Sequence, residues 1–117
     1  MKTEVKQINK EVLIMKQAND NNFNELVNED KLTVVDFYAT WCMPCQMQAK
    51  VLEKLDSSRS DEYDIIKVNV DEAPNLASIY EVYSIPTLVM LKNGEILRKS
   101  VGYTEEKELL SMIEELK

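Results

Sequence analysis

The sequence predicts an α/β fold, and three features of the chain support this class. Short apolar runs typical of strands alternate with segments whose apolar residues recur at helical spacing. One run, Leu32 to Ala39, is long enough and apolar enough for a central strand covered on both faces. It leads directly into Trp41-Cys42-Met43-Pro44-Cys45, which holds the only two cysteines of the chain. In α/β folds the carboxyl end of a strand is where binding and chemistry are commonly found.

The amino-terminal part divides into an arm and the start of a single domain. Residues 1–10 are polar and charged, and we expect them to form an arm outside a domain that spans residues 11–117. Glu11 to Lys16 has the pattern of a first strand. Asn19 to Asn21 can cap a short helix, and its inward face would consist of Phe23, Leu26 and Val27.

A longer helix is predicted after the central strand, from Cys42 to about Ser57. Its apolar residues at spacings of four give an expected inward stripe of Met47, Val51 and Leu55. A third strand follows from Tyr63 to Val70. Pro74 suits the first residue of a short helix that ends at about Tyr80.

The carboxyl-terminal part predicts a hairpin and a last helix. Strands from Thr87 to Leu91 and from Ile96 to Val101 are joined by an Asn93-Gly94 turn. Thr104 is the expected cap of the final helix. The inward residues of that helix are Leu109, Met112, Ile113 and Leu116. The complete order of elements is β-α-β-α-β-α-β-β-α.

Composition limits the possible partners. The chain of 117 residues has 14 basic and 21 acidic residues, a net charge of −7 that disfavours binding to nucleic acid. The first continuous apolar stretch, Val12 to Met15, is far too short to span a bilayer, and the amino terminus lacks the apolar core of a signal peptide. We therefore expect a cytoplasmic protein without a membrane partner.

The spacing of the two cysteines indicates a redox site. Thiols three residues apart can close a small disulfide ring that opens again easily. In a reducing cytosol such a pair is more often catalytic or metal-binding than structural. A zinc site needs about four ligands, and the chain has no histidine and no second cysteine pair. Only a symmetric dimer could supply four thiolates, so we expect no metal.

The order of elements, with Trp-Cys-x-Pro-Cys after the central strand, resembles the thioredoxin family. The segments that carry the resemblance are Val35 to Ala39, Trp41 to Cys45, Lys67 to Asp71, Ile85 to Thr87, Lys92 to Glu95 and Val101-Gly102. The chain departs from the family pattern at Met43, where glycine is usual, and at Lys50, where a proline commonly kinks the helix. The resemblance implies the thioredoxin fold, a central mixed five-stranded sheet flanked by four helices.

The resemblance also implies a protein-disulfide reductase that works through a reversible Cys42–Cys45 couple. Cys42, at a helix N-terminus, would be the nucleophile, with its pKa lowered from about 8.5 toward about 7. Cys45, one turn deeper, would be the resolving thiol. No bound cofactor is implied. Electrons would come from a thioredoxin reductase, either flavin- or ferredoxin-dependent, and clients would include enzymes that reduce ribonucleotides, peroxides or methionine sulfoxide.

Two charged residues interrupt the apolar strands. Asp36, if buried, would have a raised pKa suited to a proton acceptor for Cys45, through a water molecule. The alternatives are that the strand bends there or that Asp36 is merely paired. Lys67, on the neighbouring strand, is its natural partner and would either tune the pKa of Asp36 or simply neutralise it.

Two prolines belong to the predicted site. Pro44 restricts the loop between the cysteines and lacks an N–H that a first helical turn leaves unpaired anyway. The resemblance implies that Pro86 follows a cis peptide bond opposite the cysteines, where it would block metal binding and present the backbone of Ile85 to a client strand. The alternative is a trans proline that starts a strand.

An apolar rim around the cysteines is the expected client-binding surface. Its members are Trp41, Met43, Ile85, Gly102 and Tyr103. Trp41 could instead pack in the core, and Met43 could be a tolerated surface residue. We expect a monomer. The alternative functions are a non-catalytic protein-binding module of the same fold and a more oxidising disulfide oxidase or isomerase, although the latter usually has a histidine in the pair.

Overall fold

A computed structural model of the chain describes residues 15–58 and 61–117. Its strands and helices follow the predicted order, and the predicted fold class is confirmed. The arm expected over residues 1–10 and the first four residues of the strand predicted from Glu11 lie outside the described residues. The described first strand, β1, is Lys16–Ala18, so it ends two residues later than predicted.

The sheet is mixed and has five strands in the order β1-β3-β2-β4-β5. Its other strands are β2 (Leu32–Tyr38), β3 (Tyr63–Asn69), β4 (Thr87–Lys92) and β5 (Glu95–Val101). β3 pairs in parallel with β1 and with β2, whereas β4 is antiparallel to β2 and to β5. The central position of β2 agrees with its uninterrupted apolar sequence.

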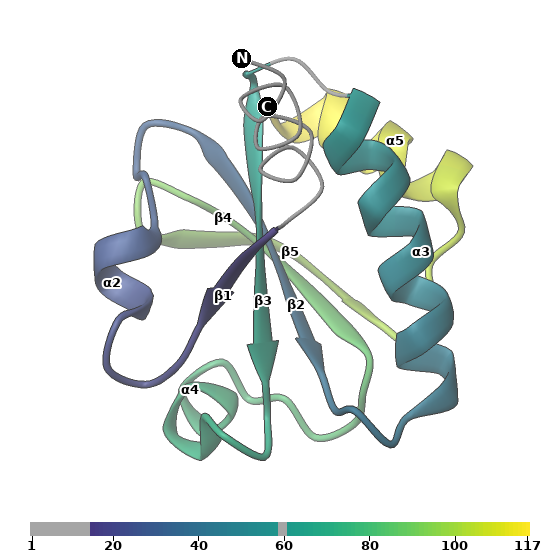
Figure 1. The fold of residues 1–117 in the computed structure, drawn as a ribbon. Coiled ribbons are helices and arrows are strands. Elements are labelled where there is room, and N and C mark those ends of the chain that lie inside the picture. Colours follow the sequence, from purple (N-terminus) through teal and green to yellow (C-terminus); the bar gives the residue numbers. More distant parts are fainter. Residues whose placement is uncertain (1–14, 59–60) are drawn as a thin grey trace, which may run out of the picture.

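The helices form a layer on each side of the sheet (Figure 1). On one face lie α3 (Met43–Ser58) and α5 (Glu106–Leu116), and on the other lie α2 (Phe23–Leu26) and α4 (Pro74–Ile79). Side chains alternate between the faces of a strand, so β2 places Val34 in the core under α3 and α5, and Val35 in the core under α2 and α4. Asp36 therefore points to the face covered by α3.

The hairpin and the last helix form largely as predicted. Asn93 and Gly94 have φ values of 54° and 78°, the left-handed conformation that a tight two-residue hairpin turn requires at both positions. Leu109, Met112 and Ile113 of α5 are buried, and Leu116 packs against the same core.

Three predicted details of the helices are wrong. Met47 does not face inward: it is 51% exposed, and the buried stripe of α3 passes through Gln48 instead. The cap expected from Asn19 to Asn21 does not form: the N-cap of α2 is Asn22, which makes no side-chain cap hydrogen bond. The carboxylate of Asp20 instead accepts the backbone N–H groups of Asn75 and Leu76 at 3.3 and 2.9 Å, in the first turn of α4. Thr104 does not cap α5, which starts after Glu105; its hydroxyl lies 2.8 Å from that of Ser100.

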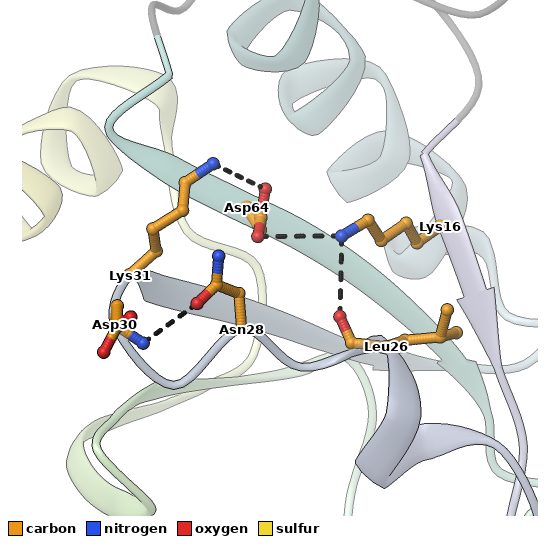
Figure 2. A network of polar contacts seen from close by, with 6 residues as sticks. All are labelled: Lys16, Leu26, Asn28, Asp30, Lys31 and Asp64. Carbon is orange, nitrogen blue, oxygen red and sulfur yellow. Dashed lines mark hydrogen bonds and ion pairs between the residues drawn. The ribbon is translucent and has the colours of Figure 1, made fainter.

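An ion-pair cluster ties the strands together at the end of the sheet remote from the cysteines (Figure 2). The carboxylate of Asp64, nearly buried on β3, lies 3.7 Å from the ammonium of Lys16 and 3.4 Å from that of Lys31. Lys16 also approaches the carbonyl oxygen of Leu26 at 3.5 Å. The two lysines thus compensate a carboxylate whose burial would otherwise be costly.

Candidate active site

The two cysteines lie at the junction where β2 leads into α3. Figure 1 shows the course of the backbone through this junction. Cys42 precedes the first residue of α3, and its carbonyl oxygen accepts the N–H of Gln46 at 3.1 Å, which makes Cys42 the N-cap. Cys45 lies one turn further along, and the two residues form a disulfide with their Cα atoms 5.2 Å apart. Both are nearly buried, Cys45 more fully than Cys42.

The sulfur of Cys42 occupies the position of a helix-capping acceptor. The backbone N–H of Cys45 donates to Cys42 Sγ at 3.3 Å, as a serine or aspartate cap would be contacted from the third helical residue. Pro44 lies between them and has no N–H to leave unpaired. The same N–H group and the positive end of the helix would stabilise a negative charge on Cys42 Sγ once the disulfide is reduced.

The loop before β4 lies against Cys42. The carbonyl oxygen of Ile85 is 3.9 Å from Cys42 Sγ, and the Ile85–Pro86 peptide bond is cis, as the family resemblance implies. The N–H of Gly102 donates to the carbonyl oxygen of Pro86 at 2.8 Å. Gly102 has a φ of +90°, a conformation that residues with a side chain rarely adopt. Ile85, Pro86 and Gly102 thus lie together beside the disulfide.

The predicted rim residues differ in how far they reach into solvent. Trp41 is 70% exposed and Met43 is 67% exposed, while Tyr103 is also exposed. The indole N–H of Trp41 donates to Asp71 Oδ2 at 2.8 Å, so its ring is held in place although it lies on the surface. The alternative that Trp41 packs in the core is therefore wrong. Asp71, which sequence reasoning missed, lies two residues after the end of β3, the strand that pairs with β2.

Asp36 is fully buried in the middle of β2. Neither of its carboxylate oxygens has a hydrogen-bond partner among the described residues. Burial raises the pKa of Asp36 from 3.8 to about 7, and the positive charge of Lys67 opposes this rise. The strand does not bend away at this point, because Asp36 remains in register with Lys67 on β3 and Leu88 on β4.

The positive charge of Lys67 acts on Asp36, yet in residues 15–58 and 61–117 no ion pair joins the two side chains. Its ammonium lies 4.4 Å above the centre of the Tyr38 ring, a cation–π contact. The interpretation of Asp36 as merely paired is therefore wrong. Lys67 instead moderates the pKa of Asp36 through space.

A hollow of about 190 Å³ opens next to the deeper cysteine. Its lining consists of Tyr38, Ala39, Thr40, Cys45, Gln46, Ala49 and Lys67. It thus connects the surroundings of Cys45 with Lys67, the residue in register with Asp36. The space is large enough for several water molecules.

A buried polar contact also escaped prediction. Gln48, in the inward stripe of α3 one turn after Cys45, bonds through its side chain to the backbone of Thr104. A glutamine among inward-facing apolar residues is the sequence signal that could have indicated it.

The described residues contain neither a grouping of metal ligands nor a membrane-spanning helix. In residues 15–58 and 61–117 no three histidine, cysteine, aspartate or glutamate side chains are grouped so that they could hold a metal ion. Over the same ranges no helix combines the length and apolarity needed to cross a membrane.

Comparison with known proteins agrees with this arrangement. The profile of the Thioredoxin family matches residues 6–115. The chain is 42% identical over 98 residues to thioredoxin from Staphylococcus haemolyticus, covering 84% of this chain and 93% of that protein. It is 40% identical over 90 residues to thioredoxin from Alicyclobacillus acidocaldarius, covering 77% and 86%.

This chain belongs to the thioredoxin family. Solved structures agree: a thioredoxin mutant from Halobacterium salinarum matches with a TM-score of 0.78 and 34% identity, over 86% of this chain and 88% of that one. Thioredoxin from Malassezia sympodialis matches with a TM-score of 0.78 and 32% identity, over 87% and 90%.

Membership defines the activity in general terms. The protein is a thiol–disulfide oxidoreductase that reduces protein disulfides, with Cys42–Cys45 as its redox-active disulfide. Like other thioredoxins it needs no cofactor. The family implies exchange of electrons with a thioredoxin reductase and with oxidised client proteins in general.

Proposed function

We propose that Cys42 is the nucleophile and Cys45 the resolving thiol of a reductase for protein disulfides. The observation that carries this assignment is the hydrogen bond from the N–H of Cys45 to Cys42 Sγ at the N-terminus of α3. It favours the thiolate form of Cys42 over that of Cys45, whose sulfur lies deeper. Pro44 has no N–H of its own, so the N–H of Cys45 is the donor that contacts the sulfur.

The reaction follows in two exchanges. The Cys42 thiolate attacks one sulfur of the client disulfide, the client S–S bond breaks, and the other client sulfur leaves as a thiolate that takes up a proton. The Cys45 thiolate then attacks Cys42 Sγ in the mixed disulfide. The bond between Cys42 and the client breaks, the client leaves reduced, and the Cys42–Cys45 disulfide forms. Two electrons pass from this protein to the client.

We assign to Asp36 the role of proton acceptor for Cys45. Its carboxylate points to the face of the sheet covered by α3, and burial brings its pKa to about 7, where it can accept a proton near neutral pH. The hollow beside Cys45 has room for the water through which the proton would travel. Lys67 tunes this pKa by lowering it.

We propose that clients dock on the rim formed by Trp41, Met43, Ile85, Gly102 and Tyr103. Trp41, Met43 and Tyr103 expose large side chains next to a reactive sulfur, which suits contact with apolar client groups. The carbonyl oxygen of Ile85 lies 3.9 Å from Cys42 Sγ, so a client strand paired with this backbone would carry its sulfur to Cys42. Pro86 adjoins this contact.

The proposal extends to partners and location. Reduction of client disulfides needs a continuing supply of electrons, which a flavin- or ferredoxin-dependent reductase would provide. The clients would be enzymes that oxidise a cysteine pair in each turnover. A compartment that keeps thiols reduced, the cytoplasm, suits this direction of exchange. The protein would work as a monomer, without nucleic acid or membrane partners.

Reduction of insulin by dithiothreitol tests the activity, and the redox potential tests its direction. We expect the protein to accelerate insulin reduction and its Cys42–Cys45 couple to have a potential of about −270 mV, the value typical of thioredoxins. Equilibration with glutathione buffers measures that potential. A value above about −200 mV would assign the protein to the oxidases and isomerases instead. A protein without activity toward insulin would fit the non-catalytic binding module.

A further inference from the structure

Gln48 is a buried polar side chain on the face of α3 that packs into the core. It is 0% exposed, with Val51, Leu52 and Leu55 following it on the same face of the helix. Its amide makes two hydrogen bonds to one residue in the loop between β5 and α5. Gln48 Oε1 accepts the backbone N–H of Thr104 at 2.7 Å, and Gln48 Nε2 donates to the carbonyl oxygen of Thr104 at 3.1 Å.

Only a side chain with both a donor and an acceptor can make this pair of contacts. The backbone N–H of Thr104 can only donate and its carbonyl can only accept, so the amide of Gln48 complements both groups in one orientation. An apolar residue at this position would leave both backbone groups buried without a partner, at a cost larger than that of one ordinary hydrogen bond. The two backbone groups of Thr104 therefore require a side chain such as glutamine at this buried position of α3.

The residue that Gln48 holds belongs to the segment that carries part of the rim. Thr104 directly follows Gly102 and Tyr103, and the hydroxyl of Thr104 lies 2.8 Å from that of Ser100 on β5. The N–H of Gly102 donates to the carbonyl oxygen of Pro86. Gln48 itself lies one turn after Cys45, so a short chain of contacts links the helix of the cysteines to the loop beside them.

We propose that Gln48 is a positioning residue for client binding, which fixes the Gly102–Thr104 loop against α3 and so sets the place of the rim relative to Cys42. This inference rests on the proposed function, because it assumes that clients dock on that rim. The side-chain hydrogen bonds of Gln48 go to the backbone of Thr104, and Gln48 has no part in the two exchange steps. Its effect is expected in the KM for a protein client and in the order of the loop, not in the exchange chemistry.

The test compares Gln48→Leu with Ile113→Ala in insulin reduction by dithiothreitol, with the concentration of insulin varied. We expect Gln48→Leu to raise the KM for insulin about tenfold, the effect of losing paired buried groups, while kcat changes less than about twofold. Ile113→Ala removes buried volume from the core under α3 and α5, far along α5 from the rim. It should lower the Tm at least as much and leave the KM unchanged.

Equal KM values for Gln48→Leu and the wild type would overturn the proposal, and so would an equal rise in both variants, which would indicate general loosening. A second measurement needs no variant. In the wild type the Thr104 amide hydrogen should exchange at least about a hundredfold more slowly than an unprotected amide, because Gln48 holds it. Exchange at the unprotected rate would refute the contact itself. Absence of insulin reduction by the wild type, with Thr104 protected, would count against the proposed function only.

Discussion

Replacing Cys42 by serine should abolish insulin reduction, a loss on the order of 10³-fold or more, because a serine hydroxyl is not ionised near neutral pH and cannot form the mixed disulfide. Replacing Cys45 by serine should have a different result. Cys42 can still attack a client, but no thiol is left to resolve the product. The Cys45→Ser variant should therefore accumulate a covalent complex with client proteins, seen as a band on a non-reducing gel that dithiothreitol removes.

The two variants control for each other. Both remove one sulfur and both abolish the intramolecular disulfide, so a shared loss of stability affects them alike. Only the identity of the nucleophile separates them. Trapping by Cys42→Ser in place of Cys45→Ser would reverse the assigned roles, and normal turnover by Cys45→Ser would exclude the two-thiol mechanism.

Asp36→Asn should make the oxidised protein more stable above neutral pH. The folded-state pKa of Asp36, about 7, is raised above its ordinary value of 3.8 by burial. Between these two values the folded protein holds a proton that the unfolded chain has released, so stability falls as pH rises from about 4 to about 7 and then stays level. The difference in pKa of about 3 corresponds to roughly 4 kcal/mol, which the asparagine variant would not lose.

Urea unfolding of the wild type and of Asp36→Asn at pH 4 and at pH 8 measures this effect. The comparison cancels the titration of all carboxylates that both proteins share. Asp64→Asn is a matched control, because Asp64 is also nearly buried on a central strand but lies against the ammonium groups of Lys16 and Lys31. Its removal should destabilise the protein. If Asp36→Asn is no more stable than the wild type at pH 8, ionisation of the buried Asp36 carboxylate does not destabilise the folded protein, and the prediction is wrong.

Local patterns were sufficient for the elements and for the cysteine site. The continuous apolar run of β2 predicts a central strand, and the Asn93-Gly94 turn predicts the hairpin, because each depends on neighbours in sequence. The approximate position of α3 also follows from local spacing. These features place Cys42 and Cys45 at the carboxyl end of β2 before any tertiary contact is known.

Long-range contacts account for the errors. Hydrophobicity favours Met47 as the inward residue of α3, but Gln48 is buried because Thr104, 56 residues away, supplies partners for its amide. Asp20 likewise caps a helix whose N–H groups lie 55 and 56 residues further along. The residues next to Gln48 or Asp20 in the sequence give no indication of these partners. The pairing of Trp41 with Asp71 belongs to the same class.

The central claim is that the amino end of α3 makes the outer sulfur an unusually acidic thiol. The most direct measurement is the rate of alkylation of Cys42 by iodoacetamide as a function of pH. The Cys45→Ser variant is used because Cys42 is then the one thiol that can react. The contact from the backbone N–H at position 45 lowers the pKa of the Cys42 thiol, so the midpoint should lie well below that of a free cysteine. A midpoint at about 8.5, with the reactivity of free cysteine, would contradict it.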